Sequence, residues 1–222
     1  MHYVFQFGVV LDNLPLLLHG ALLTIRLSAL AMVFGLGVGV IGAAVATSGP
    51  RSARLLVRGY VELIRNTPFL IQLFIIYFSL PAIGVRLRAD QAALLGMTIN
   101  LGAYATEIVR GGIDAVPFGQ IEAARALGLQ RMHVFRFVVL LPALRIVYPA
   151  LVSQFILLML GSSVVSSISA EDLTAITNTL QSTTFRAFEF YFAATLIYLV
   201  MALVFRLLLD AIGWFMFERR YA

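Results

Sequence analysis

Few side chains in this apolar sequence are of a type that does chemistry, and those few do not form an enzyme active site. The three histidines, His2, His19 and His133, are far apart, and the sequence has no cysteine and no lysine. A thiolate metal site and a phosphate-binding loop ending in Lys-Ser or Lys-Thr are therefore excluded. The serine-rich stretch Ser162–Ser169 has no histidine and carboxylate pair near it. We expect no enzymatic activity, no metal and no cofactor in this chain.

One group of polar residues interrupts an apolar segment at residues 89–109. Asn100, Tyr104 and Glu107 are spaced by four and three residues, so they share one face of a helix. Glu107 also lies three residues before Arg110, a spacing at which the two charges can pair. Charges inside a bilayer usually face a cavity or a partner, so these residues are candidates for a polar pathway. Because Glu107 and Arg110 lie near the end of the segment, a salt bridge that only positions the next loop is the alternative for them.

A second group lies in residues 116–145, the one long stretch that is neither apolar enough for a bilayer nor broken up like a surface loop. Pro117 suits the first turn of a helix, where its missing N–H has no partner in any case. Gln120–Leu127 consists of good helix formers, and Gly128 suits the left-handed residue that ends a helix. A second amphipathic turn, Arg131–Arg136, leads back into apolar sequence. We predict two short helices joined at a glycine and held between membrane spans for contact with a cytoplasmic partner.

The composition is that of a membrane protein. Of the 222 residues, 61% are hydrophobic and only 12% are charged, about half the charged share of a soluble domain. A bilayer-spanning helix needs roughly 20 mostly apolar residues. Five segments meet that criterion, namely Leu16–Ala46, Pro68–Val85, Ala89–Val109, Val138–Val164 and Phe190–Phe215. We predict an all-α, polytopic membrane protein with about five transmembrane helices, in one domain covering residues 1–222.

The positions of the arginines predict the orientation of the chain, because basic loops stay in the cytoplasm. Arginines gather after the first span (Arg51, Arg54, Arg58, Arg65), before the fourth (Arg110, Arg125, Arg131, Arg136, Arg145) and in the tail (Arg219, Arg220). The N-terminus is therefore expected outside and the C-terminus in the cytoplasm. The net charge of +5 reflects these loops and not binding to nucleic acid. Residues 1–15 are expected to lie on the outer membrane surface as an interfacial segment.

The first span contains four closely spaced glycines, Gly35, Gly37, Gly39 and Gly42. Small residues in a membrane helix let a second helix approach closely. Packing within this chain and packing against a second subunit are both open on the sequence alone.

Four stretches, taken in one order, resemble the permease subunits of binding-protein-dependent ABC importers for polar amino acids of the histidine, glutamine, arginine and glutamate type. They are Glu62–Pro68, Gly102–Gly112, the segment with Glu122-Ala123-Ala124 and Gly128 (the EAA loop of that family), and Ala143–Ile146 with Gln154–Ile156. Together they cover about positions 24–174. The resemblance implies the type I ABC importer permease fold, a pair of permease subunits, two ATPase subunits that use ATP and Mg²⁺, and an extracytoplasmic solute-binding protein.

The resemblance also implies that residues 113–140 form a cytoplasmic coupling loop that contacts the ATPase. Its central residues are Glu122, Ala123, Ala124, Arg125, Ala126, Leu127 and Gly128. Alanines give a helix a thin face on which a groove of the partner can close. A carboxylate in the first turns is favoured by the helix dipole and offers a charge to an arginine of the partner. An ordinary surface helix, with alanine present only for its helix propensity, is the alternative.

The sequence departs from the family pattern at two places. The proline that follows the coupling loop is Pro142, one residue later than in the expected Leu-Pro pair. Inside the fourth span, many relatives have a Lys-Asp pair where this chain has Leu160-Gly161-Ser162-Ser163. The last three, Gly161, Ser162 and Ser163, are further candidates for the substrate pathway. Because no acidic residue is present there, either the substrate is not cationic or a second permease subunit, expected to be a different paralogue, supplies the polar contacts.

Together these features predict an inner-membrane permease subunit that moves a polar amino acid by alternating access and is driven by separate ATPases. Residues 166–189 face outward as a connector or as part of the dock for the solute-binding protein, and the remaining partner is membrane lipid. The alternatives are an ion-coupled secondary carrier and a non-transporting scaffold subunit. Secondary carriers commonly use intramembrane acids and repeated halves, and neither is visible here. ATPase subunits that co-purify with this chain would support the ABC importer permease, because neither a secondary carrier nor a scaffold subunit is expected to bind them.

Overall fold

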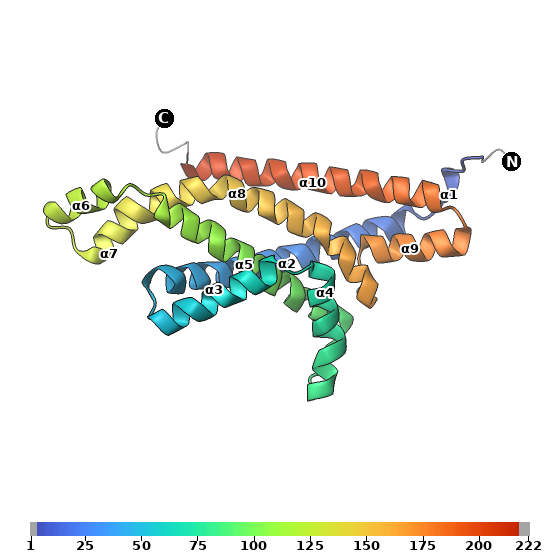
Figure 1. The fold of residues 1–222 in the computed structure, drawn as a ribbon. Helices are drawn as coiled ribbons and strands as arrows, with labels where there is room; N and C mark the ends of the chain where they lie inside the picture. The colour runs from blue at the N-terminus through green and yellow to red at the C-terminus, as the bar shows by residue number, and fades with distance from the viewer. Residues whose placement is uncertain (1–3, 218–222) are drawn as a thin grey trace. The chain divides into compact units, whose positions relative to one another are not determined.

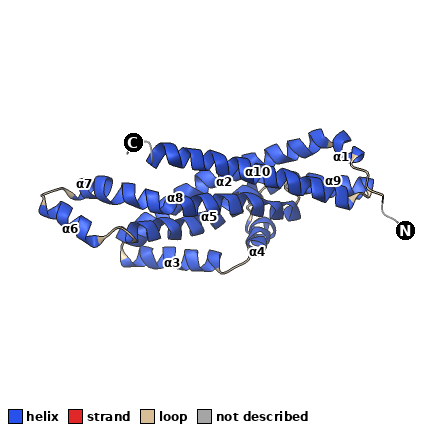
Figure 2. Cartoon of the chain, turned by 90° about the horizontal axis from the view of Figure 1, so that it is seen from above, coloured by secondary structure: helices blue, strands red, loops and turns tan. Residues whose placement is uncertain are grey.

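The computed structural model describes residues 4–217, which form helices joined by short turns, with no strand among them (Figures 1 and 2). The all-α prediction is confirmed. The α-helices are α1 (Gly8–Asp12), α2 (Leu14–Ser48), α3 (Arg51–Arg65), α4 (Phe69–Phe74), α5 (Ala89–Asp114), α6 (Phe118–Ala126), α7 (Arg131–His133), α8 (Leu140–Gly161), α9 (Leu173–Thr184) and α10 (Ala187–Phe217). Four shorter helical turns are the π-helices η1 (Ile75–Ser79) and η3 (Val134–Val139) and the 3₁₀-helices η2 (Leu80–Ile83) and η4 (Ser162–Ile168).

Four continuous helical segments in this part of the chain are long and apolar enough to cross a membrane. They are Leu14–Ser48, Ala89–Asp114, Val134–Ile168 and Ala187–Phe217. They match the first, third, fourth and fifth predicted spans, and each extends beyond the predicted limits. Hydropathy located these spans because each contains an apolar window of 18 residues with at most two charged residues.

The second predicted span, Pro68–Val85, is not an uninterrupted helix. The helical residues Phe69–Ile83 qualify as a crossing only together with α3, from which they are separated by a sharp bend. Pro68 explains the break, because it has no N–H and disfavours a helical conformation at Thr67. Gly84, with a left-handed φ of 88°, ends the helical turns on the other side. The prediction of about five crossings therefore includes one that is broken into two pieces.

The residues after the first span form a helix, although their high arginine content predicts a cytoplasmic loop. Pro50 is extended (φ −63°, ψ 158°) and begins α3. The polar residues Arg54, Arg58, Glu62 and Arg65 recur at four, four and three residues and so lie on one face. The Tyr60 hydroxyl donates to the Ile99 carbonyl of α5 at 2.6 Å, and Figures 1 and 2 both show α3 beside α5.

The chain divides into two compact units, each built from segments that are distant in the sequence. Unit 1 consists of Met1–Met32, Pro68–Met97 and Ile156–Leu208, and unit 2 of Val33–Thr67, Thr98–Phe155 and Leu209–Ala222. The long helices α2, α5, α8 and α10 contribute residues to both. The assignment of residues 1–222 to one permease domain stays a prediction.

In unit 2, the glycines of α2 pack against α5 of the same chain. A Cβ atom at Gly35 would lie 2.8 Å from the Leu101 Cβ, closer than real Cβ atoms approach, and Gly39 and Gly42 face Ala105 and Thr106 in the same way. Gly37 faces open space. Three of the four glycines therefore serve helix packing within this chain.

In unit 1, four polar residues form a buried hydrogen-bonded cluster. The Leu173 N–H donates to the Thr24 hydroxyl at 3.0 Å. Asp172 caps α9 by accepting from the Ala175 N–H at 2.7 Å, and its other oxygen accepts from the Tyr198 hydroxyl at 3.2 Å. Tyr198 also contacts the Thr174 hydroxyl at 2.9 Å. We call Thr24, Asp172, Thr174 and Tyr198 the buried polar cluster; it joins α2, α9 and α10.

The segment before α2 is fastened to the start of α10, also within unit 1. The Gln6 N–H donates to Glu189 at 3.0 Å, and Arg186 donates to the Val4 carbonyl at 3.0 Å. The predicted interfacial segment, residues 1–15, thus contains the short helix α1; its first three residues lie outside the described part of the chain. Its location on the membrane surface stays a prediction.

Candidate functional site

The predicted coupling segment is a short helix with a well-defined end. Pro117 is extended (ψ 126°) and lies just before the first residue of α6, one position earlier than predicted. At the other end, the Gly128 N–H donates to the Arg125 carbonyl at 2.9 Å and the Leu129 N–H to the Ala124 carbonyl at 3.2 Å. With Gly128 at a φ of 78°, these bonds form a Schellman motif. The prediction that Gly128 ends the helix in a left-handed conformation is confirmed.

One face of α6 is held by the rest of unit 2 and the other is exposed. Val116, Val139 and Ala143 form a small core against which Ile121 packs, and Ala124 is 5% exposed. The remaining coupling residues, Glu122, Ala123, Arg125, Ala126, Leu127 and Gly128, are exposed.

Large apolar side chains are also exposed beside them, including Phe118, Leu127 and Met132. Figure 1 shows α6 and α7 together at the ends of α5 and α8 that hold them. An exposed apolar patch bordered by charges is typical of a protein contact surface.

The second predicted short helix, Arg131–Arg136, is α-helical in its first half and π-helical in its second half. Only Arg131–His133 forms an α-helical turn, α7, and Val134–Val139 continues as η3. The wider turn ends three residues before Pro142, whose missing N–H interrupts the regular hydrogen-bond ladder of a helix. The chain passes from the coupling segment into α8 at this point.

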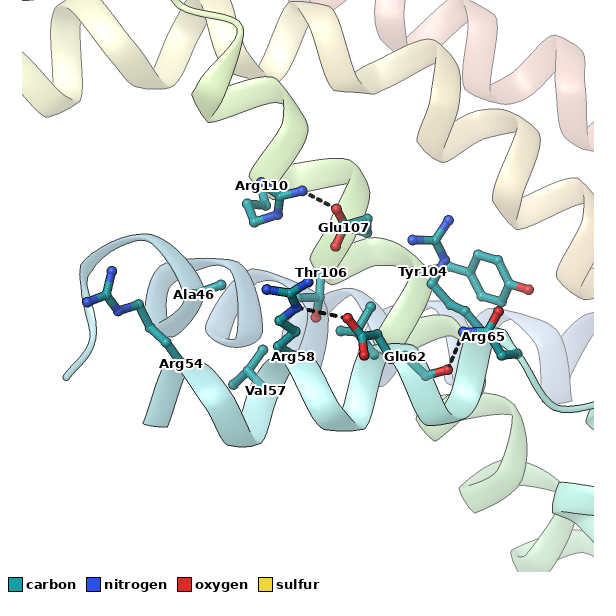
Figure 3. A pocket seen from close by; sticks show the side chains of 12 residues that line it. Ala46, Arg54, Val57, Arg58, Glu62, Arg65, Tyr104, Thr106, Glu107 and Arg110 are labelled. Carbon is teal, nitrogen blue, oxygen red and sulfur yellow. Dashed lines mark hydrogen bonds and ion pairs between the residues drawn. The ribbon is translucent and has the colours of Figure 1, made fainter. Parts of the chain in front are cut away.

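Unit 2 also contains a cavity of about 680 Å³ between α3 and α5 (Figure 3). It is lined by Ala46, Arg54, Val57, Arg58, Val61, Glu62, Arg65, Asn66, Tyr104, Thr106, Glu107 and Arg110. Four arginines and two glutamates give this lining a net charge of +2. We call this space the arginine cavity.

Two of the four arginines in the cavity are paired with carboxylates. Arg58 donates to Glu62 at 2.8 Å, and both side chains are well exposed. Arg110 pairs with Glu107 and, at 2.6 Å, with Asp114, which confirms the predicted Glu107–Arg110 pair.

The other two arginines differ from them. Among the described carboxylates, none lies within ion-pair distance of Arg54 or Arg65. The Arg65 guanidinium lies over the Tyr104 ring, 5.4 Å from its centroid (Figure 3). This distance is within the range of a cation–π interaction.

The pathway candidates fall into two places. Tyr104 and Glu107 line the arginine cavity, whereas Asn100, one turn away on α5, is not part of its lining. Gly161, Ser162 and Ser163 belong to unit 1, at the change from α8 to η4. Ser162 is fully buried and donates to the Met159 carbonyl at 2.7 Å, and Ser163 donates to the Leu160 carbonyl at 2.9 Å. Their role in a pathway stays a prediction.

The contribution of α3 to the cavity was missed from the sequence. Arg54, Arg58, Glu62 and Arg65 are four of the six charged residues in its lining, but arginine lowers the hydropathy of this stretch, which therefore resembles a loop. The four-four-three spacing of these residues, with leucines between them, was the available signal of an amphipathic helix.

Comparison with known proteins gives one consistent picture. The family model described as "Binding-protein-dependent transport system inner membrane component" matches residues 17–215. The chain is 35% identical over 202 residues to the "Glutamine transport system permease protein GlnP" of Escherichia coli K12, covering 90% of this chain and 92% of that protein. It is 32% identical over 218 residues to the "Nopaline transport system permease protein NocM" of Agrobacterium fabrum, covering 94% and 90%.

A solved structure is similar over nearly its full length. It is described as "Crystal structure of an amino acid ABC transporter with histidines", with a TM-score of 0.89 and 37% sequence identity. The match covers 98% of this chain and 100% of that one.

Proposed function

The chain belongs to the family of binding-protein-dependent transport system inner membrane components, and on that premise we propose that it moves a polar amino acid across the bacterial inner membrane. It is a multi-pass permease of an ABC transporter, a class of subunit that does no bond chemistry itself. The observation that supports an amino acid as substrate is the similarity, over at least nine tenths of both chains, to a glutamine permease and to the chain of an amino acid ABC transporter.

The complex that we propose contains two ATPase subunits, which bind ATP and Mg²⁺, and an extracytoplasmic solute-binding protein. A second permease subunit, a different paralogue of this chain, completes the pathway. The arginine-rich ends of the spans favour a cytoplasmic C-terminus and an external N-terminus. This orientation puts α6 in the cytoplasm, where the ATPases are.

In the proposed mechanism, the solute-binding protein delivers the amino acid to the outer face. ATP binding draws the two ATPases together, and their grooves move the Glu122–Gly128 segments of the two permeases with them. The exposed apolar surface of α6 and its firm attachment to α5 and α8 support this role. Tyr104 and Glu107 of the arginine cavity, with Asn100, Gly161, Ser162 and Ser163, are the proposed pathway residues.

The substrate is tested by transport into proteoliposomes that contain the complete complex purified from its own cells. Uptake of radiolabelled L-glutamine, L-histidine and L-arginine is measured with ATP and with a non-hydrolysable ATP analogue. We expect ATP-dependent uptake of at least one of them. A purified complex without ATPase subunits, or uptake that follows an ion gradient and ignores ATP, contradicts the proposal.

The coupling segment is tested with Gly128→Val, because a β-branched residue is strained at a φ of 78°. We expect ATP-dependent uptake to fall at least tenfold while the permease stays in the membrane. Gly119→Val is the matched control, because this glycine lies in α6 itself, has no positive φ and faces open space. Equal loss in both variants, or loss in neither, argues against coupling through Gly128.

A further inference from the structure

We propose that Arg65, supported on the ring of Tyr104, is the group in the arginine cavity that binds the α-carboxylate of the transported amino acid. The proposal rests on the proposed function and adds to it a residue of α3, a helix to which no substrate role was assigned. Three observations support it: the contact of Arg65 with the Tyr104 ring, the position of that ring along α5, and the charged residues that line the cavity.

The N–H donors of Arg65 are not used by a carboxylate of the described residues. The guanidinium carbon lies over the Tyr104 ring, 5.4 Å from its centroid, and no described carboxylate lies within ion-pair distance of Arg65. All N–H groups of a guanidinium lie in its plane and point away from its edges, in a fork that matches a carboxylate. The contact with the Tyr104 ring therefore holds the Arg65 cation in place without pairing it to a described carboxylate. Figure 3 shows the two side chains in this arrangement.

The depth of Arg65 is unusual for a residue that only anchors a helix. Tyr104 lies ten residues before the end of α5 at Asp114, which is about 15 Å at 1.5 Å per residue. The predicted span ends at Val109, five residues after Tyr104, so the guanidinium over this ring lies about 8 Å inside a hydrocarbon core that is about 30 Å thick. Ionised side chains at this depth face cavities and mark substrate or ion pathways. Arg65 is also the last residue of α3, at the break before α4, and broken membrane helices commonly form substrate sites.

The surrounding charges suit a zwitterion. Arg58 and Arg110 are occupied by carboxylates of the protein, so they are less available to a ligand than Arg65. Glu62 and Glu107, the partners of these two arginines, line the same cavity. A carboxylate has about four acceptor sites, so each glutamate can accept from the ammonium group of an amino acid as well as from its arginine. The cavity, at about 680 Å³, has the size of a small-molecule site.

The experiment compares acids with their neutral amides on the permease–ATPase complex in nanodiscs, without the solute-binding protein. Binding of L-glutamine, L-histidine and L-arginine is measured by isothermal titration, each beside its α-carboxamide, which keeps the ammonium group and the side chain. A charge-assisted bond to the carboxylate corresponds to a preference of about tenfold or more for the acid. We expect this preference in the wild type, its disappearance in Arg65→Gln and its partial return in Arg65→Lys.

Arg54→Gln is the matched control, because Arg54 lies on the same helix and lines the same cavity but is not stacked on Tyr104. It removes the same charge, and we expect it to keep the acid preference. Should Arg65→Gln fail to assemble, Tyr104→Leu keeps the charge but removes the ring, and we expect it to weaken binding of the acid several-fold more than binding of the amide.

Three outcomes overturn the proposal: an unchanged acid preference in Arg65→Gln, an equal loss of acid and amide binding in that variant, and an equal loss of preference in Arg54→Gln. A wild-type complex that transports amino acids without preferring acid to amide removes the carboxylate site but leaves the proposed function intact. A wild-type complex that transports none of the three removes both.

Discussion

The two units of this protein treat polar groups in opposite ways. In unit 1, Thr24 and Asp172 of the buried polar cluster are fully buried and bonded to backbone and hydroxyl partners from α2, α9 and α10, whereas Thr174 and Tyr198 are half-buried. In unit 2, the polar residues of α3 and α5 line an open cavity, and two of its four arginines have no carboxylate partner among the described residues. Polar groups that bond to one another hold helices together, whereas polar groups that face a cavity are available to a ligand.

This contrast gives different expectations for substitutions in the two units. A change in the buried polar cluster leaves a buried group unsatisfied or forces helices apart, which destabilises the fold. A change in the arginine cavity removes an exposed interaction and has little effect on stability, but it alters binding. The following predictions test the contrast through the free energy of unfolding of the purified complex, measured by denaturant titration in detergent.

The largest effect is expected at Gly20, where α2 meets the start of α9. A Cβ atom there would lie 2.9 Å from the Leu173 Cα, so Gly20→Leu must separate the two helices and cost about 3 kcal/mol, the upper end for overpacking. Gly59→Leu on α3 is the matched control, since Gly59 faces open space. Replacement of a glycine in a helix then stabilises by about 0.5–1 kcal/mol. Equal effects at the two glycines contradict the contrast.

A somewhat smaller effect is expected for Thr24→Val. The substitution keeps the shape of the side chain but removes the acceptor of the buried Leu173 N–H, and an unsatisfied buried donor costs about 1–3 kcal/mol. Thr195→Val is the control, because the Thr195 hydroxyl is exposed and donates to its own helix at Tyr191. If the two variants are equally stable, the Thr24 bond does not fasten α2 to α9.

The buried polar cluster also predicts a dependence of stability on pH. Burial raises the pKa of the Asp172 carboxyl above its ordinary value of 3.8, so the folded state holds this proton more tightly than the unfolded state. The contribution of Asp172 to stability is therefore largest below pH 3.8 and is lost as the pH rises through the raised pKa, by at most about 1.4 kcal/mol per pH unit.

Asp172→Asn should remove this dependence, because an amide keeps an acceptor for the Ala175 N–H but does not ionise. Glu171→Gln, at the exposed neighbouring residue, should leave it unchanged. Unfolding curves from pH 4 to pH 8 provide the measurement. If the wild-type protein becomes more stable as the pH rises over this range, and Asp172→Asn shows the same slope, then a group other than Asp172 determines the pH dependence of stability.

The smallest effect on stability is expected in the arginine cavity itself. Arg58 and Glu62 form an ion pair whose side chains are 78% and 59% exposed, and such pairs contribute less than about 1 kcal/mol. A double-mutant cycle of Arg58→Gln and Glu62→Gln measures the coupling directly. A coupling energy well above 1 kcal/mol indicates that this pair supports the fold and is not simply part of an open cavity.

The limits of prediction from sequence follow the same division. The spans and the coupling segment were predictable because each depends on local pattern: apolar runs for the former, and alanines followed by Gly128 for the latter. The buried polar cluster was not predictable, because Thr24 and Leu173 are 149 residues apart and only the packing of α2 on α9 brings them together.

The arginine cavity lies between these two cases. The pairing of Glu107 with Arg110 was predicted from their spacing, and so was the common face of Tyr104 and Glu107. The wall formed by α3 could not be predicted in the same way, because the four arginines in residues 51–65 are typical of a cytoplasmic loop. Tyr60 of α3 packs against Gly102 of α5 and hydrogen-bonds to the Ile99 carbonyl. The polar helix α3 therefore lies beside the apolar, membrane-spanning part of α5, where hydropathy predicts only apolar segments.

The break at Asn66–Pro68 also has a consequence for how the chain enters the bilayer during synthesis. The 15 residues of α3 measure about 22 Å, too short for a hydrocarbon core of about 30 Å, and the helical turns that follow Pro68 are no longer. Neither α3 nor the helical residues Phe69–Ile83 are long enough to insert into the bilayer as an independent transmembrane segment. We therefore expect both pieces to enter the bilayer beside spans that are already formed, and α2 and α5, which pack closely at Gly35, Gly39 and Gly42, are such spans.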